Sequence, residues 1–161
     1  MPKDFRSYLD ELLEKRPKDV VIVDKQVDPR YEASAIVEKF ERKNEFPLVF
    51  FKNIKGSKIP LVINLGATYE RLALSLGSPS VPQMVKDLAH REHNPVPVKE
   101  ISAKEAACKE VILKGDAADL DLLPVLTLNE GDAGAYVNAA AMNVDDLFGD
   151  RQSQTRPAEV V

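Results

Sequence analysis

Apolar residues recur at every third or fourth position in four stretches of this chain, and this spacing predicts four amphipathic helices. In the first stretch Phe5, Tyr8 and Leu12 fall on one face, and Pro17 stands where the helical pattern ends. Thr68 is a candidate N-cap for the third helix, and Gly77 stands where a helix commonly terminates. The predicted helices cover residues 4–16, 29–43, 68–76 and 81–91.

Three short apolar runs between these helices predict β-strands at residues 19–24, 48–51 and 59–65. The last two runs flank the segment KNIKGSK, where Gly56 and Ser57 supply turn chemistry, so we expect a hairpin there. The predicted fold class is therefore α/β (α+β), with amphipathic helices packed on a small mixed sheet.

Beyond the Pro-rich connector HNPVPVKE the chain changes to a β-rich pattern. Apolar runs predict strands at 107–113 and 135–144, and the second run is apolar enough that we expect a neighbouring strand or another chain to cover its edge. We divide the chain into an N-terminal α/β domain at 1–94, a connector with the first strands of a β-rich lobe at 95–144, and a polar tail at 145–161.

Composition narrows the class of protein. The chain has 161 residues, 44% of them hydrophobic, and a net charge of −4. This charge gives no basic face for nucleic acid, and no apolar stretch is long enough to predict a membrane span. The single cysteine, Cys108, stands in an apolar run and is interpreted as a small buried side chain. We expect a cytoplasmic protein that engages neither nucleic acid nor a membrane.

Candidate chemistry from the residues alone is sparse. The chain holds no GxSxG, CxxC, HExxH or phosphate-loop motif, so no catalytic or metal-binding residue is assigned. Three groups invite a functional interpretation as a phosphate loop, a metal site and a cation site. A solvated surface role is favoured for each group: Lys52, Lys55 and Lys58; His90 and His93; Asp116, Asp119 and Asp121.

Several linked segments resemble the UbiD family of decarboxylases. The order DFRSYLDELLE, VDPRYEASAIVEKFE and PLVFFKNIKGSKIPLVINLGATYERLALSLG resembles that family's N-terminal domain. The later run CKEVILKGDAADLDLLPVLTLNEGDAGAYVNAAAMNV is similar to the family's passage into its central domain. The resemblance covers the chain from Asp4 to about Val144.

The resemblance implies a cofactor, an activity and a fold for the later part of the chain. UbiD-like enzymes use prenylated FMN, with a divalent metal and potassium, to decarboxylate aromatic or unsaturated acids. The cofactor lies in a central split β-barrel, so the lobe at 95–144 is expected to be split-barrel-like. Catalysis is implied to depend on a Glu-Arg-Glu network, with an Asn a few residues ahead of the Arg.

The end of the sequence departs from that pattern. Arg151 and Arg156 have the separation of the family's Asn and Arg, but Arg stands at the Asn position, so no catalytic role is transferred to Arg156. We expect no cofactor to be bound by this chain alone, and no turnover by it. The implied function is a small subunit or N-terminal portion of a UbiD-like (de)carboxylase, whose catalytic residues come from a larger UbiD-like chain.

Two alternatives remain open: a non-catalytic assembly or binding module that self-associates, and a truncated product. One face of the last predicted strand is the candidate lining of any cofactor pocket, although ordinary sheet packing is its favoured interpretation. That face carries Tyr136, Asn138, Ala140 and Met142.

Overall fold

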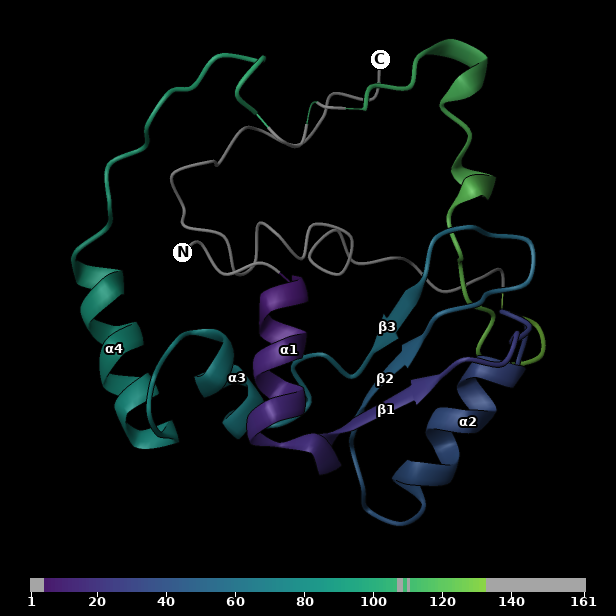
Figure 1. Ribbon diagram of the computed structural model, residues 1–161, viewed down its shortest axis with the longest axis horizontal. Helices are drawn as coiled ribbons and strands as arrows, with labels where there is room; N and C mark the ends of the chain where they lie inside the picture. Colours follow the sequence, from purple (N-terminus) through teal and green to yellow (C-terminus); the bar gives the residue numbers. More distant parts are fainter. Residues whose placement is uncertain (1–4, 107–108, 110, 133–161) are drawn as a thin grey trace.

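A computed structural model describes residues 5–106, 109 and 111–132 of the chain (Figure 1). The α-helices and strands follow in the order α1 (Phe5–Lys15), β1 (Val20–Val23), α2 (Glu32–Glu41), β2 (Leu48–Phe51), β3 (Leu61–Ile63), α3 (Tyr69–Ser75) and α4 (Val81–His93). Short 3-10 turns cover η1 (Pro17–Asp19), η3 (Gly115–Ala117) and η4 (Leu120–Leu122). The predicted α/β fold class and its four helices are confirmed.

The three strands form one mixed sheet in the order β1-β2-β3. β1 pairs with β2 in parallel, with Val20 opposite Leu48, and β2 pairs with β3 antiparallel, with Val49 opposite Ile63. The hairpin predicted from the KNIKGSK turn is therefore confirmed, and Gly56 in that turn adopts a φ of 83°, where a side chain would be strained. The parallel pairing of β1 requires the crossover that α2 supplies.

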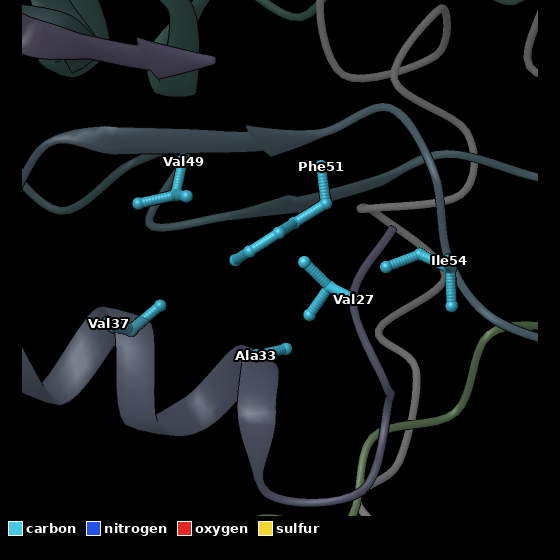
Figure 2. Packing of buried hydrophobic residues seen from close by; sticks show 6 residues of the cluster. All are labelled: Val27, Ala33, Val37, Val49, Phe51 and Ile54. Carbon is cyan, nitrogen blue, oxygen red and sulfur yellow. The ribbon is translucent and has the colours of Figure 1, made fainter. Parts of the chain in front are cut away.

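Alternate residues of the sheet supply two separate apolar clusters, one on each face. On one face Val49 and Phe51 of β2 point toward Ala33 and Val37 of α2 (Figure 2). Burying each valine or phenylalanine side chain contributes about 1.5–3 kcal/mol, so this contact orients α2 on the sheet. The buried members of the cluster are Val27, Ala33, Val37, Val49, Phe51 and Ile54.

The opposite face of the sheet is covered by α1. Tyr8, Leu12 and Leu48 have no exposed surface, and Phe5 meets Phe50 edge-on with ring centroids 5.9 Å apart. The apolar stripe predicted for the first helix is the one that packs here. The fold is thus a three-layer α/β/α sandwich built on the alternation of one central strand.

Helix α3 lies beside α1, and α4 lies on the other side of α3 (Figure 1). Side chains cap the starts of both helices. Thr68 accepts a hydrogen bond from the Arg71 N–H, and Ser80 accepts one from the Gln83 N–H. The predicted N-cap at Thr68 is confirmed, and Gly77 ends α3 with a φ of 71°. On α4 the expected apolar face is buried at Met84 alone, and Val85 on that face is 59% exposed.

Two predicted elements differ from the structure. The second helix begins at Glu32 rather than at Pro29, because Tyr31 takes a left-handed conformation and residue 30 forms a β-bridge with Thr127. The predicted strand at 107–113 is not found in its described part, where residues 111–113 are irregular and their side chains are exposed. The domain boundaries at 94 and 144 remain predictions.

Candidate functional site

A groove of roughly 630 Å³ lies between α2, the end of β3 and residues 126–129. We call it the α2–β3 groove. One stripe along α2 forms its first wall, with Tyr31, Ser34, Glu38 and Glu41 spaced so that they share a helix face. Its size falls within the range of about 300–1,000 Å³ that is typical of ligand sites.

Leu126, Leu128 and Asn129 form the second wall. They belong to the segment 122–129, which we call the strap. Its backbone is fixed to the start of α2, because the Thr127 N–H donates to the Pro29 carbonyl at 3.1 Å and the Tyr31 N–H donates to the Thr127 carbonyl at 3.0 Å. The Ser34 hydroxyl also donates to the Leu128 carbonyl at 3.3 Å. The strap therefore reaches the groove from a distant part of the chain.

Tyr31 is held in an uncommon backbone conformation at the mouth of this groove. Its φ of 64° is left-handed, which costs about 1–2 kcal/mol for a residue with a side chain. The Thr127 carbonyl of the strap compensates by accepting a hydrogen bond from the Tyr31 N–H, and the Tyr31 carbonyl accepts one from the Ala35 N–H at 2.9 Å. The ring is 45% exposed and lines the groove.

The charge of the groove is negative. Glu38 and Glu41, its charged lining residues, lie in the last turn of α2, where the helix dipole is also negative. Glu38 forms an ion pair with Arg42 at 2.7 Å, both side chains being largely exposed. Glu41 has no ion pair among the described residues. The groove therefore favours a cationic group over an anionic one.

Asn64 forms the third wall together with Ile63, and a buried arginine holds its backbone. Arg71 is 1% exposed and donates from Nη2 to the Asn64 carbonyl at 2.8 Å, while its Nε has no acceptor within the described part of the chain. Burial lowers the pKa of the Arg71 guanidinium and, on the neighbouring helix, raises the pKa of the Tyr8 phenol to about 12. Sequence reasoning missed Arg71, because nothing in YERLALS distinguishes a buried arginine from a solvated one.

The sequence-predicted lysines lie on the surface and are not gathered into one site. Lys52 pairs with Asp24 at 2.7 Å and Lys55 pairs with Asp28 at 2.8 Å, while Lys58 is exposed. The hydrogen bond between Lys55 and Asp28 is the chief cause of two shifts: it lowers the pKa of the Asp28 carboxyl and raises the pKa of the Lys55 ammonium. Lys52 and Lys55 thus act as surface partners of acids.

The other candidate ligands are also dispersed. His90 and His93 are exposed at the end of α4, where His93 Nδ1 lies 2.8 Å from the Ala89 carbonyl. The acids Asp116, Asp119 and Asp121 are exposed around η3 and η4. Within residues 5–106, 109 and 111–132, no three His, Cys, Asp or Glu side chains are placed to hold a metal ion.

The candidate pocket face of the last predicted strand lies outside the described residues, and so do Cys108, Arg151 and Arg156. That face is the one made by Tyr136, Asn138, Ala140 and Met142. The α2–β3 groove does not fit prenylated FMN, because the cofactor's phosphate would meet Glu38 and Glu41, and no lysine or arginine among the described residues lines the groove. In the described part of the chain, no helix is both long and apolar enough to cross a bilayer.

Two family models match this chain, one over most of the α/β body and one over the part that contains the strap. The model of the 3-octaprenyl-4-hydroxybenzoate carboxy-lyase N-terminal domain matches residues 11–91, which include the sheet, the second half of α1, all of α2 and α3, and α4 up to Arg91. The model of the Rift-related domain of the same carboxy-lyase matches residues 99–155, which include the strap. The chain belongs to the UbiD family, and the α2–β3 groove lies where its two family domains meet.

Particular relatives are decarboxylases. The chain is 31% identical over 150 residues to the phenolic acid decarboxylase of Sedimentibacter hydroxybenzoicus, covering 89% of this chain and 31% of the relative. It is 28% identical over 142 residues to the anhydromevalonate phosphate decarboxylase of Methanothermobacter thermautotrophicus, covering 88% of this chain and 30% of the relative. The chain thus spans about a third of the length of these curated relatives.

Solved structures confirm the fold. The UbiD-class enzyme HmfF from Pelotomaculum thermopropionicum, solved in an evolved dimeric form with prFMN, superposes with a TM-score of 0.67 at 30% identity, over 81% of this chain and 29% of that one. The closed form of the vanillic acid decarboxylase ShVdcCD from S. hydroxybenzoicus gives a TM-score of 0.68 at 29% identity, over 83% of this chain and 29% of that one.

Proposed function

We propose that this chain is the N-terminal portion or a small subunit of a UbiD-like (de)carboxylase that acts on an aromatic or unsaturated carboxylic acid. The observation that carries the proposal is the consecutive match to the family's N-terminal and Rift-related domains, at 11–91 and 99–155. Decarboxylases dominate the named relatives, which supports the reaction class.

The described residues supply a framework for this function. The α/β body orients the strap through backbone hydrogen bonds at Pro29 and Tyr31, and the strap lies within the Rift-related match. A carboxy-lyase needs a proton donor and a group that fixes the substrate carboxylate. The groove offers carboxylates where the substrate carboxylate would require a cation, so we assign substrate binding to another part of the assembly.

We also assign cofactor binding to another part of the assembly. The related HmfF structures contain prenylated FMN or FMN. Because the groove does not fit the phosphate of that cofactor, we propose that prenylated FMN, with its divalent metal and potassium, binds in the complete assembly. This chain alone is then inactive.

The test is to purify the tagged chain from its native host and to identify the polypeptides that accompany it. We expect a UbiD-like polypeptide that carries the remaining family domains, and release of CO₂ from aromatic or unsaturated acids by that complex when it is loaded with prenylated FMN. The isolated chain with the same cofactor is expected to release none.

Two outcomes contradict this proposal in different ways. Turnover by the isolated chain would show that its own residues complete the active site. A uniform self-associated species without a UbiD-like partner would instead favour a non-catalytic assembly module that kept the UbiD N-terminal fold. Release of CO₂ identifies the first result, and light scattering on the purified species identifies the second.

A further inference from the structure

We propose that the α2–β3 groove is a docking site for an extended segment of a partner polypeptide, in which apolar side chains alternate with lysine or arginine. The inference goes beyond the decarboxylase function and does not depend on it. It rests on the edge of the sheet, on the length and lining of the groove, and on its charge.

The edge of the sheet provides main-chain recognition. Within the described part of the chain, β3 pairs with β2 on one side, and its other edge has no strand partner. Such an edge presents N–H and C=O groups that pair readily with an added strand. Ile63, the last residue of β3, and Asn64 line the groove, so a segment lying in it reaches the end of this edge.

The dimensions of the groove suit a short extended segment. Its α2 wall runs from Tyr31 to Glu41, which at a helical rise of about 1.5 Å per residue is about 15 Å long. An extended chain advances about 3.3 Å per residue, so four to five residues (about 15 Å) match this wall. A compact ligand of a few atoms would leave most of it unfilled.

The lining explains the alternation. Ile63, Leu126 and Leu128 offer aliphatic surface, and Leu128 is 44% exposed, so covering it removes apolar area from water. Side chains of an extended segment point alternately to opposite sides. One set of side chains can therefore contact these residues while the other set faces the end of α2.

Charge complementarity determines which residues suit the side chains that face the end of α2. Glu38 and Glu41 lie at the negative end of the α2 dipole, where acidic side chains are unfavourable for the helix itself. No lysine or arginine lines the groove in the described structure, and Arg42 neutralises Glu38 alone. A lysine or arginine from a partner supplies the missing cation and is attracted by both carboxylates and the helix end.

The experiment uses the full chain labelled with ¹⁵N and two capped pentapeptides, Val-Lys-Val-Lys-Val and Val-Glu-Val-Glu-Val. We expect the lysine peptide to shift the amide signals of β3, α2 and the strap, and the glutamate peptide to bind at least several-fold more weakly. A lysine peptide methylated on its backbone nitrogens is expected to lose binding, because it cannot donate hydrogen bonds to the β3 edge.

Matched variants test the charge. The exposed pair E38Q/E41Q is expected to weaken binding of the lysine peptide about two- to thirtyfold, the range of two solvent-exposed ion pairs. E14Q, at an exposed glutamate of α1 outside the groove, is the control and is expected to leave the affinity unchanged. Circular dichroism checks that all variants fold.

Several results would overturn the inference. They are equal binding of both peptides, signal shifts confined to residues outside the groove, and equal weakening by E14Q and by E38Q/E41Q. Absence of any shift with the lysine peptide would overturn it as well. None of these outcomes bears on whether the chain co-purifies with a decarboxylase partner.

Discussion

Tyr8 of α1 links the packing of the sheet to the pH dependence of stability. Its side chain has no exposed surface, and burial raises the pKa of the phenol from 10.0 to about 12. The unfolded chain loses this proton near pH 10, whereas the folded chain keeps it until about pH 12. Between these values the unfolded state binds fewer protons than the folded state, so the free energy of unfolding falls as pH rises.

The size of the effect follows from the shift of about two pKa units. At about 1.36 kcal/mol per unit, the buried phenol contributes up to about 2.7 kcal/mol of stability that is fully present below about pH 10 and lost by about pH 12. Tyr8→Phe removes the titrating group but keeps the ring in the core. The unfolding free energy of the wild type minus that of Y8F should therefore fall by up to that amount as the pH rises from about 10 to about 12.

Urea denaturation of both proteins at a series of alkaline pH values measures this difference, and titrations common to both proteins cancel from it. Tyr69→Phe is the matched control, because Tyr69 is 68% exposed and no such change is expected for it. If the difference between wild type and Y8F stays constant across the interval, the phenol does not titrate as a buried group, and the packing of α1 described above is wrong.

Two further substitutions test the packing and the backbone near the groove. Leu12→Ala is expected to cost about 2–5 kcal/mol in denaturant unfolding, because Leu12 has no exposed surface. Leu13→Ala, at the half-buried neighbour, should cost less than half as much, and equal costs would contradict the orientation of α1. Asn64 has a φ of 62°, so N64G should be more stable than N64A by about 1 kcal/mol; the reverse order would show that the position is not left-handed.

Much of the body could be predicted from periodicity alone. The stripe of Phe5, Tyr8 and Leu12 predicted α1, and the Gly-containing turn predicted the pairing of β2 with β3. These elements depend on contacts close in sequence, so a local pattern carries the information. The UbiD resemblance, also stated from the sequence, agrees with the matched family domains.

The candidate site could not be predicted in this way. The groove requires Ser34 to meet Leu128, 94 positions along the chain, and the strap also moves the start of α2 from Pro29 to Glu32. In the sequence Arg71 is an ordinary polar helix position, and it becomes buried only when α3 packs against α1. The predicted pocket face at 136–142 lies outside the described residues and remains a prediction.

The sequence by itself determined which segments become helices and strands, because each needs one apolar face and the spacing of its apolar residues records that face. Tertiary structure alone decided the sheet order, the burial of Arg71 and the position of the strap against α2. Those features arise from pairings between distant segments. Their free energy depends on which surfaces remain uncovered after the local elements have formed, and no single stretch of residues encodes that.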